Sequence, residues 1–171
     1  MTRAPAALAL AVLLPATAAG AEESAPSADV VARRVVSRTP EEVTAAFADL
    51  TYAAGLFDGD CLRGWSLGVP AAGLGATARV TYVPGPLRRR LLLQVADVVS
   101  GRRVDWEHAG PKGFTTRVAA RAVEGGTEVT LTTYLSEPPW FVRHAFHEAV
   151  HPAWTACYDA ALARLDGPAV P

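Results

Sequence analysis

The sequence lacks an excess of charge of either sign. Its 16 lysine and arginine residues are balanced by 17 aspartate and glutamate residues, for a formal net charge of −1. A nucleic-acid-binding protein typically carries a basic patch or stripe, so nothing in this composition supports that class. Half of the 171 residues are hydrophobic and 19% are charged, as is typical of one folded domain rather than of a disordered chain.

Cysteine is scarce, and the motifs of several enzyme classes are missing. The sequence contains no phosphate-binding loop of the form G-x-x-x-x-G-K-[ST] and no G-x-G-x-x-G dinucleotide-binding fingerprint. Its two cysteines, Cys61 and Cys157, lie far apart in the chain, and Cys61 has no recognisable activating partner. An oxidising compartment would permit a disulfide, but separation in sequence does not reveal distance in space. We expect buried free thiols, with a disulfide as the alternative.

An apolar segment opens the chain but is too short and too rich in alanine to be a good membrane-spanning helix. It follows Arg3, and Ala19-Gly20-Ala21 fits the small-x-small pattern that signal peptidase cleaves. We therefore expect a signal peptide at 1–21, a disordered lead-in at 22–28 and one domain at 29–166. The mature protein is expected to be periplasmic or secreted; the alternatives are an uncleaved anchor and a wrongly assigned start of the chain.

Hydrophobic periodicity predicts the order of elements. Thr39-Pro40-Glu41-Glu42 has the pattern of a helix start, with Thr39 as N-cap and Glu42 three residues later, and a second short helical turn should follow it. Period-two alternation and turn residues then predict strands. The expected strands are 30–38, 61–67, 78–82, 91–99, 103–108, 114–123 and 127–135. Helical spacing returns over 140–165, where Pro152 should kink a long helix.

This order of elements resembles the helix-grip fold of the START-like (SRPBCC) superfamily, which includes polyketide cyclases, lipid-transfer domains and the birch-pollen allergens. The resemblance is carried by the segments 39–43 (TPEEV), 125–130 (GGTEVT) and 137–140 (EPPW). It implies an α+β fold in which an antiparallel sheet of six to seven strands wraps around a long C-terminal helix. It also implies a ligand cavity between the sheet and that helix, without naming the ligand.

One stripe of the last helix is rich in aromatic and histidine residues, although a second apolar face leaves open which side points inward. The stripe consists of Trp140, His144, His147, His151, Trp154, Tyr158, Leu162 and Leu165. We expect Trp140, His144 and His147 near the mouth of the cavity. Candidates for its wall are Tyr82, Trp106, His108, Phe114 and Tyr134, although simple core packing is the favoured role for each residue taken alone.

Residues 147–151 spell H-E-x-x-H, the zinc-binding pattern of a class of hydrolases. His144, His147 and His151 are the candidate metal ligands. Pro152 should distort the helix that would aim them, and three imidazoles along one helix do not readily converge on a tetrahedral ion. We therefore favour no metal and expect no cofactor.

These observations favour an exported binding or carrier protein for a small hydrophobic molecule or lipid. The alternative is an enzyme that resembles polyketide cyclases or dehydrases, with His108, His144 or His147 as general acid or base. Export disfavours that alternative, because the substrates of such enzymes are normally made inside the cell. The run Arg88-Arg89-Arg90 is expected to be a solvated hairpin end, with transient contact to anionic lipid headgroups as the lesser option.

Overall fold

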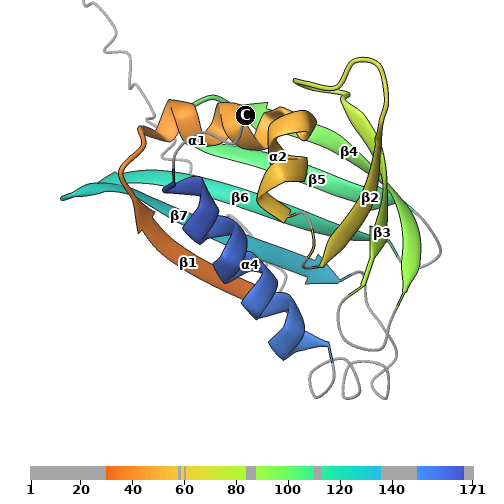
Figure 1. The fold of residues 1–171 in the computed structure, drawn as a ribbon. Coiled ribbons are helices and arrows are strands. Elements are labelled where there is room, and N and C mark those ends of the chain that lie inside the picture. The colour runs from red at the N-terminus through yellow and green to blue at the C-terminus, as the bar shows by residue number, and fades with distance from the viewer. Residues whose placement is uncertain are drawn as a thin grey trace, which may run out of the picture.

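The structure, a computed structural model, describes residues 30–57, 59, 61–83, 88–109, 113–135 and 150–167. In this part of the chain one seven-stranded antiparallel sheet, ordered β1-β7-β6-β5-β4-β3-β2, is accompanied by three helices (Figure 1). The predicted α+β helix-grip architecture is confirmed. The elements are β1 (Val30–Val36), α1 (Pro40–Ala48), α2 (Leu50–Phe57), β2 (Leu62–Leu67), β3 (Thr77–Tyr82), β4 (Arg89–Val99), β5 (Arg103–Ala109), β6 (Phe114–Val123), β7 (Gly126–Leu135) and α4 (His151–Leu165).

Helix α1 starts as its sequence predicts. The Thr39 side chain accepts a hydrogen bond from the Glu42 backbone N–H at 3.2 Å, and the Glu42 carboxylate accepts one from the Thr39 N–H at 2.8 Å. These two bonds complete the predicted capping box and lower the pKa of Glu42. On the opposite side of the helix, Thr44 Oγ1 accepts a bond of 3.0 Å from the Gly101 N–H. This bond holds the β4–β5 turn against α1.

Each strand has one face toward the core, as period-two alternation predicts. Strand β3 buries Ala78, Val80 and Tyr82 and exposes Arg79, and the register Val80↔Leu91 continues the buried face onto β4. The sheet curves around α4, which packs against β1 and α2 (Figure 1). The space between the inner face of the sheet and the three helices is therefore the core of the domain.

The described part of the last helix turns its predicted stripe inward. Trp154, Tyr158, Leu162 and Leu165 are all buried, which settles the direction of this half of the stripe. Helix α4 begins at His151 with Pro152 in its first turn, where a missing backbone N–H costs nothing. Trp140, His144 and His147, with the first half of the predicted helix, lie outside the described residues.

Among the described residues, no helix combines the length and the apolar character needed to cross a membrane.

The C-terminal end of α4 is hydrogen-bonded to the elements beside it. The Arg38 side chain donates to the Leu165 carbonyl at 2.6 Å, and Arg164 donates to the Leu56 carbonyl at 2.6 Å. Asp166 accepts two bonds of 2.8 Å from Ser37, which lower the pKa of Asp166. The helix is thereby fixed against β1 and α2.

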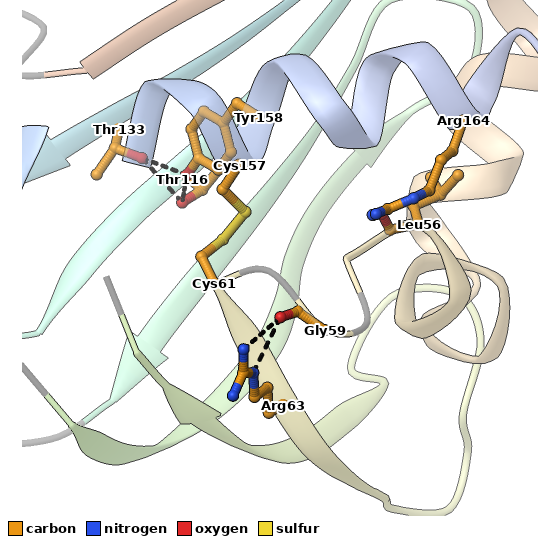
Figure 2. The surroundings of a disulfide bond; sticks show 9 residues. All are labelled: Leu56, Gly59, Cys61, Arg63, Thr116, Thr133, Cys157, Tyr158 and Arg164. Atoms are coloured by element: carbon orange, nitrogen blue, oxygen red, sulfur yellow. Dashed lines mark hydrogen bonds between the residues drawn. A yellow bond between two sulfur atoms is a disulfide. The ribbon is translucent and has the colours of Figure 1, made fainter. Parts of the chain in front are cut away.

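The expectation of free thiols is wrong. Cys61 and Cys157 form a disulfide, with their Cα atoms 5.7 Å apart, that joins the residue before β2 to the inner face of α4 (Figure 2). The 96 residues that separate them in sequence gave no sign of this pairing. Their proximity arises only when α4 docks beside the start of β2, which local sequence patterns do not reveal.

Candidate functional site

Aromatic side chains from the sheet and α4 line the core in two connected groups. In the first group, Phe47, Phe57 and Trp106 lie with ring centroids 5.7 to 6.4 Å apart. In the second, the Trp154 ring lies 4.5 Å from Tyr82 and 5.0 Å from Phe114. His108 stacks on Phe114 at 3.9 Å with an angle of 19° between the rings. Tyr158 connects the two groups, at 6.1 Å from both Phe57 and Trp154.

A cluster of hydroxyl groups lies between these groups. The Tyr158 hydroxyl is 2.6 Å from Thr133 Oγ1, and Thr116 Oγ1 is 3.2 Å from each of them (Figure 2). His108 joins the cluster through its Nε2 atom, 3.2 Å from Thr116 Oγ1. Cross-strand register explains the arrangement, because Thr116 on β6 lies directly opposite Thr133 on β7. We call His108, Thr116, Thr133 and Tyr158 the polar cluster.

The polar cluster is uncharged near neutral pH. Burial lowers the pKa of His108 from 6.5 to about 3, because the imidazolium form would lose its hydration. Burial also raises the pKa of Tyr158, an effect that its hydrogen bonds to the threonines partly oppose. The nearby Tyr82 has a pKa raised well above 10.0, again mainly by burial. The imidazole and both phenols are therefore neutral groups that act through hydrogen bonds.

Two buried polar atoms beside the polar cluster have no hydrogen-bond partner in the described part of the chain. They are the Tyr82 hydroxyl and His108 Nδ1, on side chains whose residues are only 6% and 3% exposed. Both rings contact Phe114, with centroids 5.5 Å and 3.9 Å from it. Leaving such a group unsatisfied costs about 1–3 kcal/mol. The Tyr52 hydroxyl, Trp65 Nε1 and Thr155 Oγ1 also lack a partner in the described part of the chain, but the Tyr82 hydroxyl and His108 Nδ1 belong to two side chains that contact the same aromatic ring.

Comparison with solved structures identifies the architecture. The KanY protein superimposes with a TM-score of 0.69 at 19% identity, over 82% of this chain and 95% of that one. Ara h 8.0201 gives 0.54 at 11%, over 79% and 95%. The Aha1 dimer protein from Colwellia psychrerythraea gives 0.51 at 19%, over 80% and 92%. The fold is the helix-grip fold. At these identities the likeness establishes the fold alone.

No family model matches the sequence. The search of curated proteins likewise finds no match.

The helix-grip fold assembles most of the predicted wall residues, but not all of them. Tyr82, His108 and Phe114 meet at the second aromatic group, as their inward positions predict. Trp106 lies in the first group, where its Nε1 donates to the Phe47 carbonyl at 3.0 Å. Its side chain is buried as part of the core. Tyr134 lies on the outer face of β7, with the Arg117 guanidinium 5.9 Å from its ring centroid. The structure thus places Tyr134 away from the other candidates.

Sequence reasoning missed Thr116 and Thr133. Their signal was present, since Thr133 shares its face of β7 with Val129 and Leu131, both fully buried. A polar residue at an inward position of a strand predicts a buried hydrogen bond. Which partner it meets depends on the register of two strands, which the sequence alone did not provide.

The metal hypothesis falls mostly outside the described residues. His144 and His147 lie there, and His151 is half-buried at the start of α4. Within the ranges that the structure describes, no group of three or more His, Cys, Asp or Glu residues is arranged to hold a metal ion.

The outer face of the sheet has a different character. A groove of about 650 Å³ crosses strands β2 to β4 and is lined by Gly64, Ser66, Arg79, Val80, Thr81, Arg90, Leu91 and Leu92. The neighbouring Arg88 and Arg89 are exposed, as the predicted solvated hairpin end requires. This groove is basic and open to water, whereas the polar cluster is neutral and buried.

Proposed function

We propose that the protein is an exported binding protein for a small, mostly apolar molecule held between the inner face of the sheet and α4. The observation that carries this proposal is the pair of unsatisfied buried atoms, the Tyr82 hydroxyl and His108 Nδ1, beside Phe114 and Trp154. Buried polar groups in proteins are nearly always paired, so each exception calls for an explanation. A mostly apolar ligand with a polar group would pack against Phe114 and Trp154 and would supply hydrogen-bond partners for these two atoms.

Two further features support the proposal. The START-like resemblance implies a ligand cavity in this position, between the sheet and the C-terminal helix. The predicted signal peptide at 1–21 implies export, and the Cys61–Cys157 disulfide is compatible with an oxidising compartment. The ligand would be carried or sequestered outside the cytoplasm.

The site favours binding over catalysis. A general acid or base works best when its pKa is close to the working pH, whereas the pKa of His108 is lowered to about 3. Without a ligand, neutral His108 is therefore a weak general base. It also cannot serve as a general acid at neutral pH, because it carries no imidazolium proton there. A cyclase-like mechanism would have to depend on His144 or His147.

Native mass spectrometry of the protein exported by its own host is the primary test. We expect one small apolar molecule per chain. After the protein is unfolded, stripped and refolded, it should bind the neutral fluorescent probe N-phenyl-1-naphthylamine with saturation, and the extracted molecule should displace the probe. Absence of both a co-purified molecule and saturable probe binding would overturn the proposal.

A matched pair of variants locates the site. Phe114→Leu alters the second aromatic group and should weaken probe binding by about tenfold, with a small change in melting temperature, because Phe114 is half-buried at the start of β6. Phe47→Leu alters the fully buried first group and should lower the melting temperature while leaving the dissociation constant unchanged. The reverse pattern would place the ligand elsewhere.

A further inference from the structure

The contacts around Thr116 determine which nitrogen of His108 carries the proton. Four hydrogen-bond contacts connect the polar cluster. Thr116 Oγ1 is 3.2 Å from His108 Nε2, from Thr133 Oγ1 and from the Tyr158 hydroxyl, and Thr133 is 2.6 Å from Tyr158. Each hydroxyl can donate only one hydrogen bond. The three hydroxyls therefore supply three of the four protons that these contacts require.

The fourth proton must come from His108. When Nε2–H donates to Thr116, the three hydroxyls are free to donate around their triangle, and all four bonds form. Thr116 then donates once and accepts twice, which is its full capacity. If Thr116 donated to Nε2 instead, one side of the triangle would have no proton. Because the cluster is buried, the arrangement with every bond formed is the favoured one.

This assignment gives the two unsatisfied atoms opposite characters. With its proton on Nε2, neutral His108 presents Nδ1 as a hydrogen-bond acceptor. The Tyr82 phenol retains its proton, because burial raises its pKa well above 10.0, and it therefore presents a donor. Both side chains contact the same Phe114 ring. An acceptor and a donor thus flank one aromatic wall.

From this complementarity we propose that the ligand is a neutral apolar alcohol or phenol, whose hydroxyl donates to His108 Nδ1 and whose oxygen can accept from Tyr82. The inference depends on the proposed binding function and specifies its ligand class. A ketone or an ether has no proton for Nδ1, and a hydrocarbon leaves both atoms unsatisfied. A carboxylate also has no proton to donate, and its charge would be buried without a cation.

The tautomer can be tested in the ligand-free full chain. In a sample with nitrogen-15 in the histidine rings, nitrogen chemical shifts distinguish a protonated from an unprotonated ring nitrogen. We expect His108 to be protonated at Nε2 and bare at Nδ1 at neutral pH. A proton at Nδ1, or an imidazolium, would overturn the inference because no acceptor would face the ligand.

The ligand class can be tested by calorimetry with four probes of similar shape: 2-naphthol, 2-methoxynaphthalene, 2-methylnaphthalene and 2-naphthoate. We expect 2-naphthol to bind about tenfold more tightly than the ether, because one hydrogen bond to a buried acceptor contributes about 1–1.5 kcal/mol. His108→Phe, which keeps a ring stacked on Phe114, should abolish the gap between alcohol and ether. Tyr82→Phe should keep that gap and instead abolish the gap between ether and hydrocarbon.

The outcomes separate this inference from the proposed function. If 2-naphthol, the ether and the hydrocarbon bind equally and Phe114→Leu weakens all three, the site binds apolar molecules but the preference for a hydroxyl is wrong. If 2-naphthoate binds most tightly, the neutral-ligand assignment is wrong. If no probe binds and nothing co-purifies, the proposed function itself fails.

Discussion

The two ends of the core differ in how the polar atoms of their buried side chains are satisfied. At one end Trp106 donates to the Phe47 carbonyl, and between the two ends Tyr158 bonds to Thr133 and Thr116. At the other end, the Tyr82 hydroxyl and His108 Nδ1 lack partners within the described part of the chain. Burial alone does not distinguish the two ends, and a missing partner alone does not either, because the Tyr52 hydroxyl on α2 also lacks one. What sets the second end apart is that two such polar atoms belong to side chains that contact one aromatic ring.

Position in the fold accounts for the difference. The satisfied end lies beneath α1 and α2, which cover Trp106 and supply the carbonyl that it needs. The unsatisfied end lies where strands stop, since Tyr82 is the last residue of β3 and Phe114 the first of β6. Strand ends lead into loops, and loops beside a rigid scaffold are where binding residues commonly lie.

The largest expected effect concerns the disulfide that holds α4 against the sheet. Replacing both cysteines, as in Cys61→Ala with Cys157→Ala, should lower the free energy of unfolding by about 2–5 kcal/mol, because the bond closes a long loop. Urea unfolding of the variant against the oxidised wild type measures this. Equal midpoints would mean that the bond does not form in solution, and both ends of the core would then be held by packing alone.

The next effect is specific to the satisfied end. Trp106→Ala removes a fully buried indole and leaves the Phe47 carbonyl without its donor, so we expect a loss of about 3–5 kcal/mol. Trp65→Ala, at a half-buried position on β2, should cost less than half as much in the same urea titration. Similar losses would indicate that the first aromatic group is not the rigid part of the core.

Acid should weaken the fold through His108. The folded pKa of about 3 lies below the unfolded value of 6.5, so the unfolded state takes up this proton first. Stability is therefore complete above about pH 6.5 and falls as pH drops, with a slope that approaches about 1.4 kcal/mol per pH unit. Measurements between about pH 5 and 6.5 avoid the carboxylates. There His108→Gln should flatten the slope, and an unchanged slope would show that another group causes it.

Local patterns predicted the elements of this fold but not its polar pairings. The capping box at Thr39 and the strand alternation depend on neighbours in sequence, and both are confirmed. The same alternation places Tyr134 on the outer face of β7, because Thr133 faces inward and adjacent residues of a strand point to opposite faces. The Cys61–Cys157 bond and the Thr116–Thr133 contact depend on docking and register between distant segments. No local pattern encodes them.

The smallest effect is the sharpest test of the comparison, because the same atom is removed from a tyrosine with hydrogen-bond partners and from one without. Tyr82 and Tyr158 are 6% and 3% exposed. Tyr158→Phe removes a hydroxyl that bonds to two threonines and should cost about 1–2 kcal/mol in ligand-free protein. Tyr82→Phe removes a hydroxyl without a partner and should leave the free energy of unfolding unchanged or slightly higher.

Adding 2-naphthol should narrow the difference in stability between the two variants. A ligand that binds only the folded state raises its stability, and Tyr82→Phe should gain less from the ligand than Tyr158→Phe does. Urea unfolding of both variants, with and without 2-naphthol, measures the two shifts. An equal cost of the two substitutions in ligand-free protein would mean that the Tyr82 hydroxyl is satisfied by the chain itself. The contrast between the two ends would then disappear, because the core would need no ligand to complete its hydrogen bonds.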